Sequence, residues 1–236
     1  MKKIYFSLLL FAVILAGISE GQFTRVITIS NYNLEVDVGK SVHVKNTITV
    51  KNLINSPIVP GIGELRLQKR APVKVLFLPI PFTEKKSAIA VENVKAYTED
   101  GRKIPVRVTD EGDYTTIVYE IWYPVEPGKE FTFVVEYDSE ELAESGLLFR
   151  DISIPVGSDM EIESISASFN SSWKTVYTEK TPERLPVGGI MFYTAEFSPL
   201  PLPQVGIKWS LLFWSIILLL SVVMFIYVKN RRENVQ

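Results

Sequence analysis

The chain of 236 residues contains no cysteine and a single histidine, His43. The lack of cysteine excludes a disulfide-built scaffold, a catalytic thiol and a zinc–thiolate site. A catalytic base or metal ligand at His43 would need all of its partners from Asp and Glu. Because His43 falls on the polar side of an alternating segment, we expect it to be a solvated strand residue.

Catalytic motifs are also missing from the sequence. It has no GxSxG, no HExxH and no phosphate-binding glycine loop, and Gly61-Ile62-Gly63 follows a proline-rich loop, where glycines indicate a turn. Carboxylate pairs such as Glu99/Asp100 and Asp110/Glu111 fall in expected turns without aromatic sugar platforms beside them. We therefore expect no enzyme activity, no cofactor and no metal site. A carboxylate-dependent hydrolase remains the enzymatic alternative, and it would require two buried acids facing one cleft.

The charge balance does not support nucleic-acid binding. The whole chain carries a formal net charge of −2, and residues 22–208 hold 20 basic and 25 acidic residues, a net charge of −5. Proteins that bind nucleic acids present a positive surface to the phosphates, so we expect no nucleic-acid partner.

Residues 209–228, WSLLFWSIILLLSVVMFIYV, form an uninterrupted apolar run without charge, glycine or proline. As a helix, this run would extend about 30 Å, the thickness of the hydrocarbon core of a bilayer. Trp209, Trp214 and Tyr227 lie at or near its ends, where aromatic rings favour the headgroup boundary. A buried core helix, the alternative, is usually shorter and has a polar stripe. The run predicts a transmembrane helix in the lipid bilayer.

The flanking charges predict the orientation of that helix. Lys229, Arg231 and Arg232 follow it within the short tail 229–236, and clustered positive charge stays on the cytoplasmic side. At the other end, residues 1–21 have a basic start, an apolar run and small residues, which is the pattern of a signal peptide cleaved after Ser19 or Gly21. An uncleaved signal anchor is the alternative. Both readings predict that residues from about 22 onward are exported. With a cleaved signal peptide, the chain is a single-pass protein of the cell membrane with its N-terminal domain outside and its C-terminus in the cytoplasm.

Between these segments, residues 22–198 alternate apolar and polar side chains with a period of two. This pattern is typical of antiparallel strands with one face on a core, and turn residues recur every eight to twelve positions. We expect strands at 34–38, 42–50, 73–78, 91–97, 104–108, 114–123, 131–137, 152–156, 161–169, 175–177 and 190–197. Asn46 interrupts the apolar face of its strand, which predicts a bulge or a strand that crosses an edge. The fold class is therefore mainly β, an antiparallel β-sandwich followed by one C-terminal transmembrane helix.

One helical pattern interrupts the strands. Asp138 followed by Glu141 resembles a capping box, and Gly146 would end a helix of two turns at most. Residues 138–146 would also be the boundary if the region formed two small sandwiches rather than one elaborated sandwich. Residues 198–203, which lead into the stem 199–208, read SPLPLP, and their alternate prolines favour an extended stretch whose six residues would reach about 20 Å.

Two surface features are candidates for contacts or modification. Arg66, Lys69 and Arg70 form a basic cluster beside the apolar loop 58–62, which is either an ordinary solvated strand and turn or a contact with lipid headgroups or an acidic partner. Asn170-Ser171-Ser172 is an N-glycosylation acceptor sequence in a domain expected to be exported.

The segments VKAYTEDGRKIPVRV (94–108) and PVEPGKEFTFVVEY (124–137) carry a family resemblance. They resemble the lumenal β-domain of ribophorin I, a non-catalytic subunit of the eukaryotic oligosaccharyltransferase, and the overall order of signal peptide, β-rich ectodomain, single span and basic tail is similar. The resemblance covers about 45 residues and this ectodomain is much shorter than that of the family. It implies an accessory role beside glycosylation or translocation machinery and transfers no catalytic residue.

Together these features predict a non-enzymatic interaction or scaffolding protein, an accessory subunit of an envelope membrane complex with a membrane-protein partner. Ser210, Ser215 and Ser221 would let partner helices approach the span closely. The alternative is a self-standing cell-surface protein for ligand binding or adhesion, whose isolated ectodomain would bind a soluble ligand.

Overall fold

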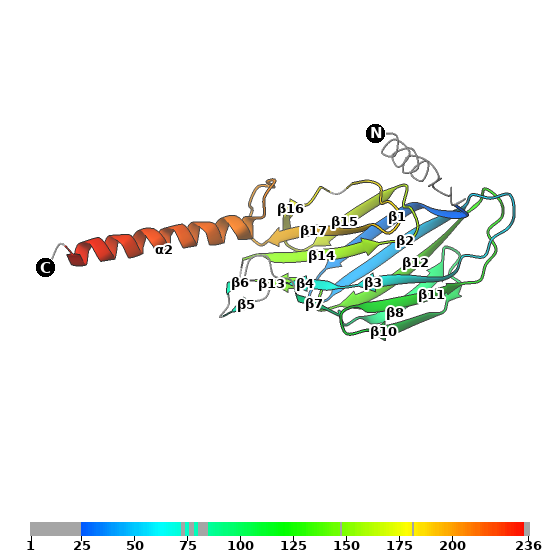
Figure 1. The fold of residues 1–236 in the computed structure, drawn as a ribbon, viewed down its shortest axis with the longest axis horizontal. Helices are drawn as coiled ribbons and strands as arrows, with labels where there is room; N and C mark the ends of the chain where they lie inside the picture. Colours follow the sequence, from blue (N-terminus) through cyan, green and yellow to red (C-terminus); the bar gives the residue numbers. More distant parts are fainter. Residues whose placement is uncertain are drawn as a thin grey trace, which may run out of the picture.

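The computed structural model describes residues 25–71, 74–75, 78–79, 85–146, 148–180 and 182–233. The expected signal peptide, residues 1–21, lies outside the described residues. The described part of the chain is mainly β and ends in one long helix, α2 (Trp209–Glu233) (Figure 1). The expected fold class, a β-rich region followed by a single C-terminal apolar helix, is confirmed.

The largest sheet has six strands and contains both early and late parts of the chain. Their order across the sheet is β15 (Ile165–Ser171), β1 (Ile27–Val38), β2 (Val42–Asn52), β12 (Glu130–Ser139), β8 (Glu92–Thr98) and β9 (Lys103–Ile104). β15 is parallel to β1, and the other pairs in this sheet are antiparallel.

Two smaller sheets lie opposite the large one. One has the order β10 (Val106–Asp110), β11 (Thr115–Ile121) and β3 (Gly61–Leu67), and the other has β13 (Ala143–Ser145), β14 (Arg150–Gly157), β17 (Ile190–Ser198) and β16 (Lys174–Thr178). Two short ladders complete the strands: β4 (Lys69–Ala71) with β7 (Lys85–Ser87), and β5 (Lys74–Val75) with β6 (Leu78–Pro79).

The core lies between the large sheet and the two smaller ones. Tyr119 of β11 meets Phe133 of β12 with ring centroids 5.1 Å apart, and Phe169 of β15 meets Phe197 of β17 at 6.5 Å. Buried apolar side chains from residues before and after 138–146 belong to one continuous cluster. Because β15 also completes the sheet that begins with β1, residues on both sides of 138–146 share one core.

The period-two pattern of the sequence is realised most regularly in the β1–β2 hairpin. Along β2, every second side chain is buried, and Val42 pairs with Val38 across the turn at Gly39 and Lys40. The expectation of a bulge or an edge crossing at Asn46 was wrong, because β2 is a central strand and its pairing with both neighbours is continuous there. The irregularity in this hairpin lies instead in β1, between Ile29 and Asn31.

Asn46 is tolerated in the core because both the oxygen and the nitrogen of its amide have hydrogen-bond partners. Its Oδ1 accepts a hydrogen bond of 2.7 Å from the Tyr32 hydroxyl, and its Nδ2 donates one of 3.1 Å to the Val135 carbonyl. Buried polar groups are stable where each has a partner, so the residue that breaks the apolar pattern links three strands.

The short helix expected at 138–146 was also wrong. β12 continues through Ser139, and β13 occupies Ala143–Ser145. The Asp138 carboxylate, expected to cap a helix, accepts hydrogen bonds from neighbouring strands instead: its Oδ1 lies 2.7 Å from His43 Nδ1, and its Oδ2 accepts from Asn93 Nδ2 at 2.7 Å. Cross-strand partners thus replace the local helical ones. His43 is a partly exposed strand residue, as expected.

The segment 73–78, expected to be one strand, lies partly outside the described residues. In its described part, Val75 pairs with Leu78. The described residues of this segment therefore belong to two short antiparallel strands rather than to a single strand.

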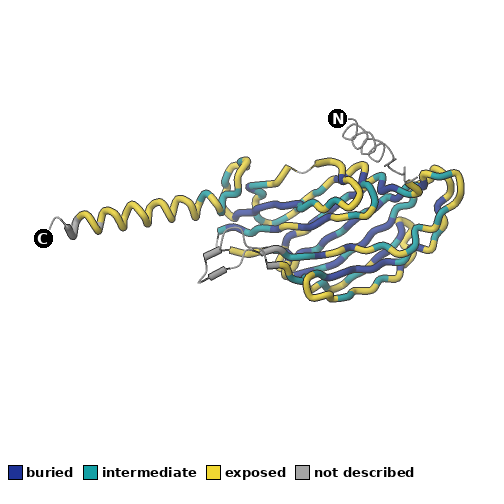
Figure 2. Tube along the Cα trace, in the orientation of Figure 1, coloured by how far each residue is buried: buried dark blue, intermediate teal, exposed yellow. Residues whose placement is uncertain are grey.

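The helix α2 extends away from the sandwich along the longest axis of the molecule (Figure 1). Its side chains are exposed along almost its whole length (Figure 2), and over Trp209–Tyr227 it is long and apolar enough to cross a membrane. Residues 199–208, expected to be an extended spacer, form a loop that returns to the end of β17. Val205 N donates to the Val176 carbonyl of β16 at 3.4 Å, so the sandwich adjoins the helix directly.

Candidate functional site

The start of α2 is held by a buried carboxylate of the sandwich. Glu196, in β17, is 0% exposed, and its two carboxylate oxygens accept hydrogen bonds from the backbone N–H groups of Trp209 (2.6 Å) and Ser210 (3.0 Å). The first N–H groups of a helix lack partners within the helix, and the positive end of the helix dipole favours an anion. Glu196 therefore acts as an N-terminal cap supplied by a different element.

A second ion pair flanks this cap. Asp151 of β14 is the cross-strand neighbour of Glu196, and its Oδ1 lies 2.9 Å from Nζ of Lys208, the residue immediately before α2. Burial raises the pKa of the Asp151 carboxyl, the pairing with Lys208 opposes this rise, and the nearby Glu196 carboxylate adds to it. Lys208 thus offsets negative charge at the point where two carboxylates meet.

Aromatic packing completes the contact between sandwich and helix. Phe149, next to β14, packs edge-to-face on Phe213 of α2 with ring centroids 6.0 Å apart. We call Glu196, Asp151, Lys208, Phe149 and Phe213 the helix joint. Hydrogen bonds, an ion pair and ring packing act together there, so the geometry defines a firm connection between a β-sandwich and an apolar helix.

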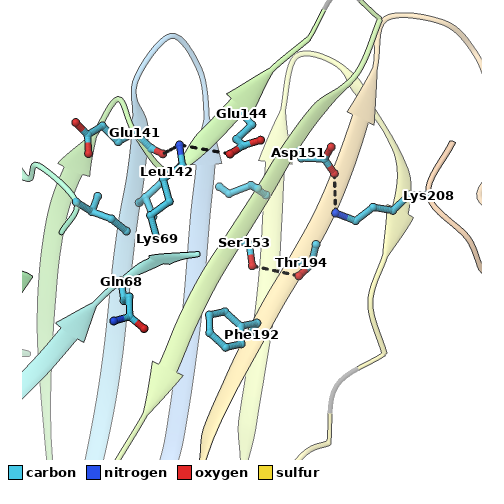
Figure 3. A pocket seen from close by; sticks show the side chains of 12 residues that line it. Gln68, Lys69, Glu141, Leu142, Glu144, Asp151, Ser153, Phe192, Thr194 and Lys208 are labelled. Carbon is cyan, nitrogen blue, oxygen red and sulfur yellow. Dashed lines mark hydrogen bonds and ion pairs between the residues drawn. The ribbon is translucent and has the colours of Figure 1, made fainter. Parts of the chain in front are cut away.

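A cleft of about 390 Å³ opens beside the helix joint (Figure 3). Its charged lining residues are paired with one another: Lys69 Nζ lies 3.5 Å from Glu144 and donates to the Glu141 carbonyl at 3.3 Å, while Asp151 pairs with Lys208. Ser153 Oγ lies 3.3 Å from Thr194 Oγ1, with no base or acid hydrogen-bonded to it among the described contacts. Among the described residues that line this cleft, no observed contact activates a nucleophile.

The predicted basic cluster is divided between two clefts. Arg66 pairs with Glu64 at 3.0 Å and lines a cleft with Asp159, whereas Lys69 lines the cleft beside the helix joint. Arg70 lies in β4, and its side chain lies outside the described residues. The two described cations of the cluster therefore do not form one patch.

The other predicted residues lie in accessible places. Asn170 is exposed in β15, an edge strand, and its Nδ2, the atom that would carry a glycan, donates to Asp37 Oδ1 at 2.9 Å. Trp209 begins α2 and its Nε1 donates to the Pro203 carbonyl at 2.8 Å, while Trp214 and Tyr227 are exposed along the helix.

The basic residues after the span belong to the end of α2. Lys229 lies in its last two turns, and the side chains of Arg231 and Arg232 lie outside the described residues.

The sequence did not reveal the role of Glu196 or Asp151. Both occur in strands whose apolar neighbours show no feature typical of a helix cap, and each meets α2 only through the fold. Among the described residues, no three His, Asp or Glu side chains come together to hold a metal ion.

Comparisons with known proteins give one relative and several distant folds. No family model matches the chain. The chain is 33% identical over 131 residues to an uncharacterised protein of Methanocaldococcus jannaschii, an alignment that covers 55% of this chain and 98% of that protein.

The solved structures are far more distant. Leukotriene A4 hydrolase from Saccharomyces cerevisiae shares 11% identity and a TM-score of 0.38, covering 82% of this chain and 31% of that one. An M1 zinc metallopeptidase from Deinococcus radiodurans shares 9% identity and a TM-score of 0.36, covering 75% and 40%. The chain thus spans about a third of the length of these enzymes, and a likeness this weak says nothing about activity.

The fold and the helix joint define a class of protein: a β-sandwich attached firmly to one candidate membrane-spanning helix. Within that class, the chain belongs to the same family as the Methanocaldococcus jannaschii protein, nearly all of which it covers.

Proposed function

We propose that this protein is a non-enzymatic, membrane-anchored interaction protein that acts as an accessory subunit of an envelope membrane complex. The observation that carries the proposal is the helix joint. A buried carboxylate that caps α2 fixes the direction of the sandwich relative to the span. A fixed direction favours binding to a partner in the same membrane. The surface of the sandwich then faces the surface of that partner in one orientation, so less orientational freedom is lost on binding.

The orientation in the membrane follows from charge. Lys229, Arg231 and Arg232 lie at the end of α2 opposite the sandwich, so the positive-inside rule supports a cytoplasmic C-terminus and a sandwich outside the cell membrane. The resemblance of residues 94–108 and 124–137 to ribophorin I is the reason for proposing glycosylation or translocation machinery as the complex. In the fold these residues are neighbours, because β12 pairs with β8.

One observation favours the second candidate function, a self-standing surface protein that binds a ligand. At the end of the sandwich opposite α2, Ile62 and Trp122 are 61% and 60% exposed, and Val59 lies in the adjoining loop at 50%. Large apolar side chains that gather on a surface are typical of interaction sites.

The two candidates differ in what accompanies the protein in its own membrane. The tagged full-length chain would be extracted from native membranes in mild detergent, and the proteins that remain bound would be identified. We expect a stoichiometric membrane-protein partner whose recovery falls in Glu196→Gln and persists in Glu126→Gln, an exposed control. A monomer without any partner would overturn the accessory role and leave the ligand-binding candidate.

A further inference from the structure

β15 forms one edge of the six-stranded sheet, where it pairs on one side with β1. The N–H and C=O of a strand residue point to the same side, and that side alternates from one residue to the next. Ile165 N donates away from β1, to the Glu183 carbonyl at 2.9 Å. The backbone groups of Ala167 and Phe169, which follow at every second position, therefore also point away from β1. We call this side of residues 167–169 the β15 edge.

The β15 edge has no strand beside it among the residues that the structure describes. The side chains of Ala167 and Phe169 are only half-buried, whereas the residues opposite them in β1 are buried. On its inner side Phe169 packs against Phe197 of the facing sheet. A further strand at the β15 edge would form hydrogen bonds with the outward backbone groups and would cover both half-buried side chains.

The other edges of the three larger sheets are protected against pairing, and β15 is not. Proteins usually protect an edge strand by charge, proline, a bulge or short length. β9 and β13 have only two and three residues, and the charged residues of the other three edges are Arg107 and Asp110 in β10, Glu64 and Arg66 in β3, and Lys174 in β16. β15 has seven residues, ISASFNS, without charge, proline or a shift in its register with β1. An edge of this kind favours pairing with another chain.

The chemistry of the β15 edge identifies the kind of partner. Another polypeptide backbone offers donors and acceptors at the spacing of a strand, and its alternate side chains can reach the half-buried Ala167 and Phe169. A second copy of this chain fits less well. The strands of the sandwich run lengthwise, in line with α2 (Figure 1), so an antiparallel pair of β15 strands would direct the two α2 helices to opposite sides. Two copies in one membrane require both helices on the same side.

We propose that the β15 edge binds an extended, uncharged segment of the membrane partner, which adds one strand to the six-stranded sheet. The segment places apolar side chains beside Ala167 and Phe169 and polar side chains beside the exposed Ser168. The inference rests on the proposed accessory function and names the surface through which the partner is held. A strand added to the β15 edge runs in line with α2, which suits a segment that rises from the same membrane.

Substitutions on the two faces of β15 test this surface in the full-length chain, extracted from native membranes in mild detergent. Ala167→Lys places a charge where the added strand would lie, and Ala167→Pro removes an N–H that points away from β1, which an edge strand tolerates. Ser168→Lys places the same charge on the opposite face and is the matched control. We expect partner recovery to fall at least about fivefold in both Ala167 variants, the effect of one lost hydrogen bond, and to persist in Ser168→Lys. Near-UV circular dichroism of each purified variant establishes that it is folded.

Hydrogen exchange at single-residue resolution reads the backbone pairing directly. We expect the amides of Ala167 and Phe169 to exchange slowly in the extracted complex and rapidly once the partner is dissociated, while the amide of Ser168, which points toward β1, exchanges slowly in both. Rapid exchange at Ala167 and Phe169 in a complex that contains a partner would overturn the inference and leave the accessory function standing. Recovery of the chain without any partner would overturn both. A partner strand that proves to be a second copy of this chain would overturn the assignment to a different polypeptide.

Discussion

Replacing Glu196 by glutamine tests the helix joint with the smallest change in shape. Glu196 accepts two hydrogen bonds, from the N–H groups of Trp209 and Ser210. In Glu196→Gln, the amide oxygen accepts one of them, and the amide NH₂ then faces the other N–H, so donor opposes donor. The negative charge that complements the positive end of α2 is also removed.

The expected cost follows from these losses. A hydrogen bond to a charged group contributes about 1.5–3 kcal/mol, and a charge at a helix terminus contributes about 0.3–1 kcal/mol. Removing the charge also relieves the desolvation of a fully buried carboxylate, which offsets part of the loss. We expect a net loss of about 2 kcal/mol. For a protein of this size that corresponds to a fall in the unfolding midpoint of about 4–8 °C.

Thermal unfolding of the full-length protein in detergent, followed by near-UV circular dichroism, measures this change. Glu126→Gln serves as the matched control, because it makes the same substitution at an exposed residue of a turn. Glu196→Gln with the same midpoint as Glu126→Gln would refute the conclusion that the carboxylate stabilises the start of α2.

Three further predictions concern the sandwich and its ends. Burial raises the pKa of Asp151, so its contribution to stability is fully present below the ordinary carboxyl pKa and is lost as the pH rises through the raised value. Asp151→Asn should therefore flatten the decline of unfolding free energy across that window in urea titrations; an unchanged slope would contradict the assignment. Asn46→Ala leaves the buried Tyr32 hydroxyl without its acceptor and should cost about 3 kcal/mol in urea unfolding, against a loss under about 1 kcal/mol if the site were solvated. N-terminal sequencing should find the mature chain beginning at residues 20–22, because β1 begins at the end of the sandwich opposite α2 (Figure 1) and an uncleaved anchor would have to reach the membrane from that end; a retained leader would contradict this.

Those parts of the fold that depend on local periodicity were predictable. The alternation in residues 42–50 fixed the buried face of β2, and the apolar run 209–228 gave the position of α2. The pairing of β15 with β1 was not predictable, because parallel partners distant in the sequence share no turn. The helix expected at 138–146 was wrong for a similar reason: Asp138 has a strong local capping pattern, but partners on adjacent strands compete for its carboxylate.

The candidate site was less accessible to sequence reasoning than the fold. Glu196 follows buried Ala195 and precedes buried Phe197, so no period-two pattern marks its side chain as functional. Its role depends on a loop that brings residue 209 back to β17. The proline-rich sequence of residues 199–208 instead favoured an extended spacer. Local propensity carries no information about tertiary contacts, and it is tertiary contacts that bring this loop back to β17.

The contacts of the helix joint imply that the sandwich and α2 form one rigid body. Spin labels at Ser172→Cys on the sandwich and Ser215→Cys on α2, both exposed positions, would report the distance between the two parts in lipid nanodiscs. We expect one narrow distribution of distances in double electron–electron resonance, which broadens when Glu196→Gln is added. A broad distribution in the otherwise unaltered chain would contradict it, because the helix joint would then not hold the sandwich in place.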